Sequence, residues 1–191
     1  MEISKEEKAY LLNIVALVLE QCVGLGKKLE ELSFPSVPTP QLAEKCGAFV
    51  TYHTAHGHEK ELRGCIGYME GIFPLWETVA RMAYAAAFQD NRFLPIEKKE
   101  LPAIRYEITV LTPFEPCANT DDIEIGKHGI LMECEQHRAV FLPQVPLEQG
   151  WNKVQTLEFL SMKAGLPKNA WQKSNAQFFV FTGIVLEDKA I

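Results

Sequence analysis

The chain has 191 residues, of which 47% are apolar and 23% are charged, and its formal net charge is −6. This composition is typical of a globular protein, and a chain of this length buries roughly 70% of the surface that its unfolded form exposes. We therefore expect a single domain over residues 1–191. Binders of nucleic acid or of anionic membranes depend on clustered basic residues, so the scattered, outnumbered lysines and arginines argue against both kinds of partner.

Two further features bear on the cellular compartment. The five cysteines are widely spaced and form no Cys-x-x-Cys pair, which indicates reduced thiols rather than a zinc ribbon or a redox motif. The N-terminus lacks the basic start of a signal peptide, and the apolar run over residues 11–19 is too short to span a bilayer. We expect a cytoplasmic protein.

The first elements are a long helix and a connector. Ser4 and Glu7 have the spacing of a capping box, and the apolar positions after them predict a helix that ends near Gly24 or Gly26. The prolines within residues 34–40 exclude regular helix there.

Strands and helices then alternate irregularly. In chain order, the patterns predict strands over 48–52 and 62–69, a helix over 75–88, a strand over 104–112, a hairpin of 129–134 and 139–142, a helix from Asn152 to about Ala164, and an apolar strand over 177–186. Because few βαβ units are present, we expect an α+β fold, with a largely antiparallel sheet and flanking helices.

One predicted strand contains a cysteine between two glycines, in Leu62-Arg63-Gly64-Cys65-Ile66-Gly67-Tyr68. Glycine in a strand often marks a bulge or the close approach of a ligand or another backbone, so Gly64 and Gly67 are candidate binding positions. A nearby cation such as Arg63 favours a thiolate, which makes Cys65 a candidate nucleophile. The alternative is a buried cysteine that packs as a small apolar residue.

A histidine lies between glycines just before another predicted strand, in Gly126-Lys127-His128-Gly129. On an exposed tight turn the His128 ring can face a cleft and act as the base for Cys65. The alternative is a turn histidine that bonds to its own backbone.

Two more segments carry polar side chains at candidate binding positions. Asp90 and Arg92 follow the helix over 75–88, where they either position a polar ligand or hold the helix end as an ion pair. Gln144 and Glu148 lie in a proline-containing stretch that is expected to be extended and rigid, and both are candidates for a cleft lining.

Three histidines, His53, His56 and His58, lie in the polar loop predicted between the first two strands. Zinc needs three or four donors in a tetrahedral array, and one flexible loop without a fixed acidic ligand is a poor site. The chain also has no Gly-rich phosphate loop, no Gly-x-Ser-x-Gly elbow and no His-Glu-x-x-His helix. We expect neither a metal nor a cofactor.

Five segments resemble, in this order, the blocks of the AMMECR family: 47–51, 62–67, 90–95, 125–129 and 142–145. The resemblance extends over roughly residues 5–187 and implies a compact two-lobed α+β fold with a cleft between the lobes. The family has no settled biochemical activity. Carried over residue by residue, its motifs point to these positions: Arg63, Gly64, Cys65, Gly67, Asp90, Arg92, His128 and Gln144.

The resemblance also implies partners. Prokaryotic members resemble the first component of a three-protein system, beside a Memo-like protein and a radical S-adenosylmethionine enzyme, and residues 142–151 resemble that branch.

Two hypotheses for the function follow. The first is an accessory component whose cleft binds a small polar ligand or a partner protein. The second is an enzyme that uses Cys65 as nucleophile and His128 as base, with Arg63 or Asp90 orienting the substrate for acyl or related group transfer.

Overall fold

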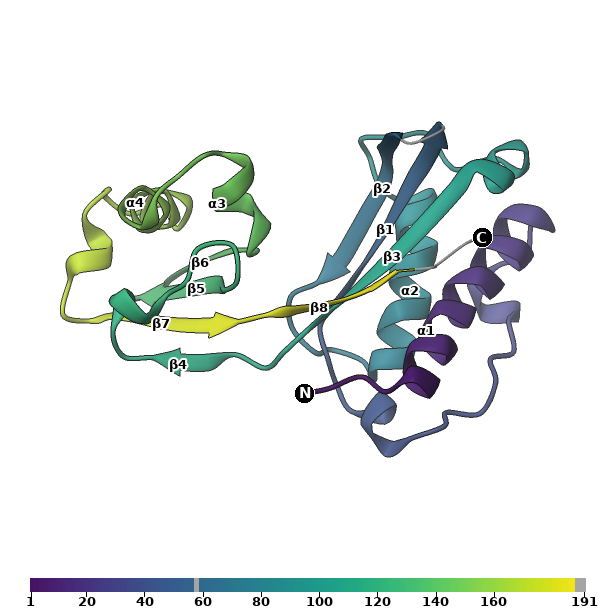
Figure 1. The fold of residues 1–191 in the computed structure, drawn as a ribbon, viewed down its shortest axis with the longest axis horizontal. Helices are drawn as coiled ribbons and strands as arrows, with labels where there is room; N and C mark the ends of the chain where they lie inside the picture. The colour runs from purple at the N-terminus through teal and green to yellow at the C-terminus, as the bar shows by residue number, and fades with distance from the viewer. Residues whose placement is uncertain (57–58, 188–191) are drawn as a thin grey trace. The chain divides into compact units, whose positions relative to one another are not determined.

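The computed structural model describes residues 1–56 and 59–187, which divide into two compact units (Figure 1). The first unit comprises residues 1–111 and the segment from Ile184 onward, and the second comprises Thr112–Gly183. Each unit has a four-stranded antiparallel sheet and helices. The predicted α+β class is confirmed, with its antiparallel pairing divided between two sheets. In the part of the chain that is described, no helix is long and apolar enough to cross a membrane.

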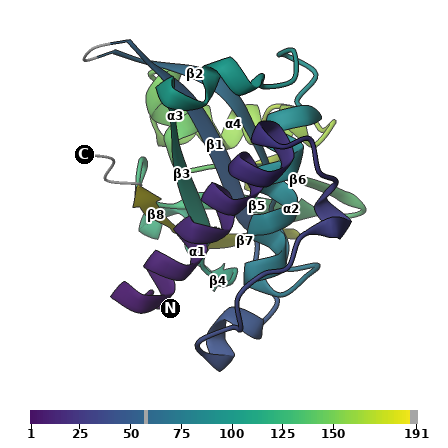
Figure 2. The ribbon, with the colours of Figure 1, turned by 90° about the vertical axis from the view of Figure 1, so that its right-hand side faces the viewer.

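The sheet of the first unit has the strand order β2-β1-β3-β8. Its elements are α1 (Lys5–Val18), β1 (Ala48–His56), β2 (Glu59–Tyr68), α2 (Leu75–Phe88), β3 (Ile104–Leu111) and β8 (Gly183–Glu187). A π-helical turn, Leu19–Gly24, extends α1, and short 3-10 turns occur at Leu29–Glu31, Pro40–Ala43 and Lys98–Ala103. The helices α1 and α2 lie on the same side of the sheet (Figure 2).

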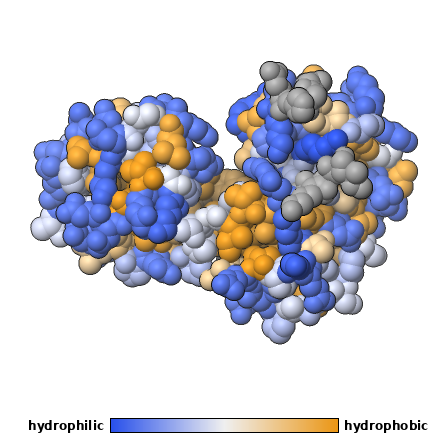
Figure 3. Space-filling model, viewed as in Figure 1, coloured by the Kyte–Doolittle hydropathy of each residue, from blue (hydrophilic) through white to orange (hydrophobic). Residues whose placement is uncertain are grey.

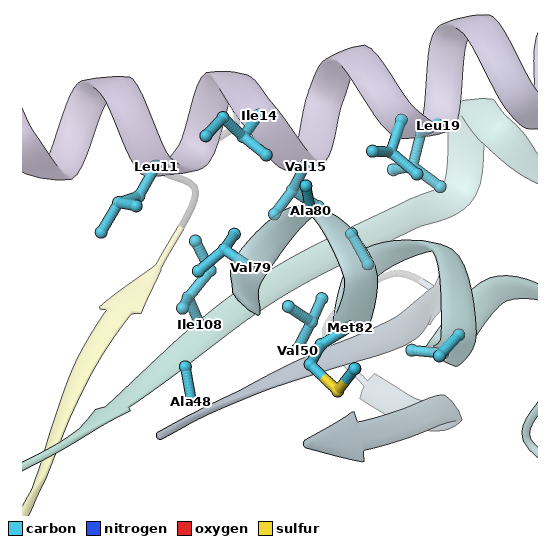
Figure 4. Close-up of a cluster of buried hydrophobic side chains, with 14 of the residues drawn as sticks. Leu11, Ile14, Val15, Leu19, Ala48, Val50, Val79, Ala80, Met82 and Ile108 are labelled. Atoms are coloured by element: carbon cyan, nitrogen blue, oxygen red, sulfur yellow. The ribbon is translucent and has the colours of Figure 1, made fainter. Parts of the chain in front are cut away.

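The helix α1 begins at the predicted capping box. The backbone N–H of Ser4 donates to Glu7 Oε2 at 2.8 Å, and the N–H of Glu7 donates to Ser4 Oγ at 3.2 Å. These bonds satisfy two backbone donors that a helix N-terminus leaves open. The apolar stripe of α1 then packs onto α2 and the sheet through Leu11, Ile14 and Val15, all of which are fully buried (Figure 4).

The central strand β1 sorts its side chains onto two faces. Ala48, Val50 and Tyr52 are fully buried beneath the helices, in the cluster of which Figure 4 shows a part. Because successive side chains of a strand point to opposite faces, Thr51 and His53 lie on the face away from the helices. We call this side of the first sheet, opposite α1 and α2, the helix-free face. Polar residues of the central strands, such as Thr51 and His53, lie on it.

The two glycines of β2, Gly64 and Gly67, lie where neighbouring atoms leave no room for a side chain. A Cβ atom on Gly64 would lie 2.3 Å from the carbonyl oxygen of Ala86 in α2, and one on Gly67 would lie 2.2 Å from the ring of Phe49. The alanines at the end of α2 are small, so the helix backbone can approach the sheet closely. Close approach of another backbone, one of the roles that glycine has in a strand, thus accounts for Gly64.

The sheet of the second unit has the order β4-β7-β5-β6. Its elements are β4 (Glu115–Cys117), β5 (Gly129–Cys134), β6 (His137–Phe141), α3 (Gln144–Glu148), α4 (Lys153–Lys163) and β7 (Ala176–Phe181), with 3-10 turns at Thr120–Asp122 and Ala170–Gln172. Its separate core includes Ile130, Met132, Leu157 and Leu160, all essentially buried. Over the face drawn in Figure 3, the surface of both units is mainly hydrophilic, with smaller hydrophobic areas on each.

Three sequence-based expectations differ from the structure. The single strand expected over 177–186 is two strands, β7 and β8, which belong to different sheets. The polar loop expected after residue 52 is shorter, because β1 and β2 continue their pairing as far as His56 and Glu59. The stretch that carries Gln144 and Glu148 was expected to be extended, but it forms the helix α3. Its prolines allow this because Pro143 takes helical angles, and Pro146 lies in the first turn, where a missing N–H removes no helical hydrogen bond.

The packing of α2 on β2 predicts a penalty for any side chain at residue 64. Gly64→Ala places a methyl group against the Ala86 carbonyl and should lower the free energy of unfolding by at least about 2 kcal/mol. Gly24→Ala is the control, because its Cβ would meet nothing closer than 3.7 Å. Urea denaturation followed by circular dichroism measures both, and equal stabilities of the two variants would contradict the packing argument.

Candidate functional site

Three neighbouring strands bring a thiol, a hydroxyl and a carboxylate into one row. Cys65 on β2 lies opposite Thr51 on β1, and Thr51 lies opposite Glu107 on β3. Opposite residues of antiparallel strands share a face, so all three lie on the helix-free face of the first sheet. The Thr51 hydroxyl donates to Cys65 Sγ at 3.2 Å, and Cys65 is half-buried.

His53 adds an imidazole beside this row. Its Nε2 lies 3.9 Å from Glu107 Oε1, and its side chain is 20% exposed. The other ring nitrogen, Nδ1, is buried and has no hydrogen-bond partner among the described residues. His53 was expected in a loop, whereas it lies on β1. His58 and the side chain of His56 lie outside the described residues, so the expectation of no metal in this segment stays a prediction.

The backbone of Cys65 is fixed by an ion pair between a buried carboxylate, Asp90, and an exposed guanidinium, Arg92. Asp90 Oδ2 accepts the N–H of Cys65 at 2.9 Å, and Arg92 Nη2 donates to the Cys65 carbonyl at 3.2 Å. Arg92 also donates to both Asp90 oxygens, at 2.7 Å through Nη2 and 2.9 Å through Nε. The segment after α2 thereby satisfies an outward-facing N–H and C=O of β2, an edge strand of its sheet.

This geometry explains why Thr51 reaches the thiol. The N–H of Cys65 points to Asp90, away from β1, so Cys65 and Thr51 form a non-hydrogen-bonded pair. Side chains of such pairs lie closer together than those of hydrogen-bonded pairs. The ion pair thus holds the outer edge of β2 at the residue whose thiol faces Thr51.

The charge on Asp90 is retained in a buried setting, since only 5% of the residue is exposed. The hydrogen bonds from the Arg92 side chain lower the pKa of Asp90 to well below its ordinary value, against the effect of burial, and the N–H of Cys65 lowers it further. Asp90 is therefore a carboxylate throughout the physiological pH range.

Arg63 forms an ion pair with Glu100. Its Nε donates to Glu100 Oε1 at 2.7 Å and its Nη2 to Glu100 Oε2 at 3.2 Å, a two-pronged pair that lowers the pKa of Glu100. Arg63 has no opposite residue on β1, because the register shifts between Tyr52 and His53. An action of Arg63 on the Cys65 thiol stays a prediction.

The remaining candidates lie in the second unit. His128 Nδ1 accepts the backbone N–H of Glu124 at 3.1 Å, the local hydrogen bond given above as the alternative to a catalytic role. Gln144 and Glu148 are exposed and one helical turn apart on α3. Cys65 lies in the first unit and His128 in the second, so the Cys65–His128 pair stays a prediction.

Among the residues predicted from sequence, the structure brings together Cys65, Asp90 and Arg92. Sequence reasoning missed Thr51 and Glu107, although both occupy outward positions of strands that it predicted. The signal that was lacking is the pairing register, which places them beside Cys65.

The ion pair predicts a specific acid sensitivity. A carboxyl group whose pKa is lower in the folded state than in the unfolded state stabilises the fold above its unfolded pKa, about 3.9, and this stabilisation is lost as the pH falls toward the folded value. The free energy of unfolding should therefore decrease as the pH is lowered below about 4. Asp90→Asn should make that decrease less steep, and it should lower the free energy of unfolding at pH 7 by about 2 kcal/mol. Urea denaturation between neutral and acidic pH checks this.

Asp121→Asn, at an exposed aspartate of the second unit, is the matched control and should leave the wild-type slope unchanged. Equal slopes for wild type and Asp90→Asn would contradict the assignment.

Comparisons with known proteins place the chain in a family. The AMMECR1 family model matches residues 12–186. A protein of Aquifex aeolicus is 39% identical over 165 residues, 84% of each chain, and Protein NEQ441 of Nanoarchaeum equitans is 35% identical over 180 residues, 91% of this chain and 98% of the relative. The crystal structure of the uncharacterized protein PH0010 from Pyrococcus horikoshii matches with a TM-score of 0.79 and 31% identity, over 99% of this chain and 95% of that one. The resemblance drawn from the sequence motifs is confirmed, and the chain belongs to the AMMECR1 family.

Proposed function

We propose that the protein is a binding component that takes a small polar ligand on the helix-free face of its first sheet. The observation that carries the proposal is the row of Cys65, Thr51 and Glu107, which places three different polar groups on adjacent strands. Thr51 is buried in the middle of the row, whereas Cys65 is half-buried and Glu107 is partly exposed. Strands hold side chains more rigidly than loops do, so such a row suits the orientation of a small molecule.

The chemistry of the row favours a ligand with hydroxyl or amino groups. Glu107 accepts hydrogen bonds when ionised, and the thiol of Cys65 is a weak donor and acceptor. The Thr51 hydroxyl, which donates to Cys65 Sγ, can still accept a hydrogen bond. The Glu107 side chain is 27% exposed and accessible to a ligand. On the same face, the ring of Phe49 fills the place that a side chain at Gly67 would take, and so adds an apolar group beside the row.

The anchoring of Cys65 supports binding rather than a packing role alone. Asp90 and Arg92 fix the peptide groups on both sides of one residue whose side chain contributes little to the buried core. Fixing a functional group in advance reduces the entropy lost when a ligand binds.

Two expectations from the family resemblance stay predictions. One is association with a Memo-like protein and a radical S-adenosylmethionine enzyme. The other is catalysis by Cys65 with His128. The proposed ligand site requires neither.

Ligand binding should protect Cys65 from alkylation. The native protein is treated with iodoacetamide, with and without a protein-free small-molecule extract, and the five cysteines are followed by mass spectrometry. We expect the extract to slow the labelling of Cys65 but not of Cys117, a half-buried thiol in the second unit. Glu107→Gln removes an ionised acceptor and should weaken the protection about tenfold.

Glu115→Gln, at an exposed glutamate on β4, is the control and should leave the protection unchanged. Labelling of Cys65 that is unaffected by the extract, or protection that survives Glu107→Gln in full, would contradict the proposed site.

A further inference from the structure

A pocket of about 260 Å³ lies in the first unit, on the side of the helices rather than on the face that carries Cys65. It is formed by the 3-10 turn Leu29–Glu31, by the proline-containing connector and by one side of α2. Its lining consists of Leu29, Glu30, Phe34, Trp76, Glu77, Ala80 and Arg81.

Aromatic rings form a wall of this pocket. The rings of Phe34 and Trp76 lie 5.9 Å apart between centroids at an interplanar angle of 56°, and both residues are half-buried. Leu29 and Ala80 add apolar surface. Aromatic side chains carry a negatively polarised ring face, which attracts a cation placed over it.

The charged side chains that line the pocket are two glutamates and one arginine, so their charges do not cancel. Arg81 donates to Glu77 Oε1 from Nε at 2.8 Å and from Nη2 at 2.6 Å, which neutralises one carboxylate. Among the residues that the structure describes, no Lys or Arg forms an ion pair with Glu30. Two carboxylates and one guanidinium leave the pocket with a net charge of −1.

We propose that this pocket binds a small organic ammonium ion, with Trp76 and Phe34 against its apolar groups and Glu30 as its counter-charge. Tryptophan is the side chain whose ring face attracts cations most strongly, and a carboxylate nearby adds Coulombic attraction. The same corner of α2 already holds one cation in this way, since the Arg81 guanidinium lies 4.2 Å from the Phe73 centroid while paired with Glu77. The net negative charge disfavours anions.

Choline and its uncharged isostere 3,3-dimethyl-1-butanol distinguish a cation site from a merely apolar pocket. Each is titrated into the ¹⁵N-labelled protein while the indole N–H resonances are followed by NMR. The chain has three tryptophans, so Trp151 and Trp171, both in the second unit, report any non-specific effect. We expect saturable choline-dependent shifts at Trp76 alone, and binding of the isostere at least about tenfold weaker.

Two variants test the assigned roles. Glu30→Gln, at an exposed position, should weaken choline binding about fivefold without unfolding the protein, and Trp76→Leu should abolish it. Glu20→Gln, at an exposed glutamate outside the pocket lining, should bind choline as the wild type does. Equal affinity for choline and the isostere, no saturable shift at Trp76, or unchanged binding by Glu30→Gln would overturn the proposal. None of these outcomes bears on the Cys65 face.

Discussion

The buried carboxylate of Asp90 is the interaction on which the arrangement around Cys65 depends. It accepts the N–H of Cys65 and three donors of Arg92, namely the backbone N–H, Nε and Nη2, while Arg92 donates in turn to the Cys65 carbonyl. A charge with only 5% of its residue exposed is tolerable because each of its oxygens has a donor. The pair joins the end of α2 to the outer edge of β2, and so ties the helix that covers the sheet to the strand that carries the thiol.

The two faces of the first sheet then have separate roles. One face is an apolar core, in which Gly64 lets the backbone of α2 approach β2. The other face carries the row of Cys65, Thr51 and Glu107, whose spacing follows from the strand register. Because alternation along a strand fixes which residues share a face, a register slip of one residue would bury the polar row and expose the core. The packing under the helices is therefore what holds the polar groups in place.

Sequence patterns predicted the elements whose signals are local. The capping box at Ser4 and Glu7 and the helix over 75–88 depend on neighbours a few residues apart, and both are confirmed. The division of the last apolar stretch into β7 and β8 depends on which sheet each strand joins, and periodicity carries no such information. The same limit applies to the site. Cys65, Asp90 and Arg92 stood out by residue type, whereas Thr51 and Glu107 look like ordinary strand residues until the pairing is known.

The exchange rate of a single amide tests most directly whether Asp90 holds the outer edge of β2. The N–H of Cys65 faces the outer edge of β2, where, within residues 1–56 and 59–187, Asp90 is its hydrogen-bond acceptor. Hydrogen exchange followed by NMR at neutral pH should show this amide protected in the wild type. In Asp90→Ala it should exchange about tenfold faster or more, the equivalent of losing roughly 1.4 kcal/mol, while the amides that pair β1 with β3 keep their rates. An unchanged rate for Cys65 would contradict the claim that Asp90 holds the strand edge and the thiol upon it.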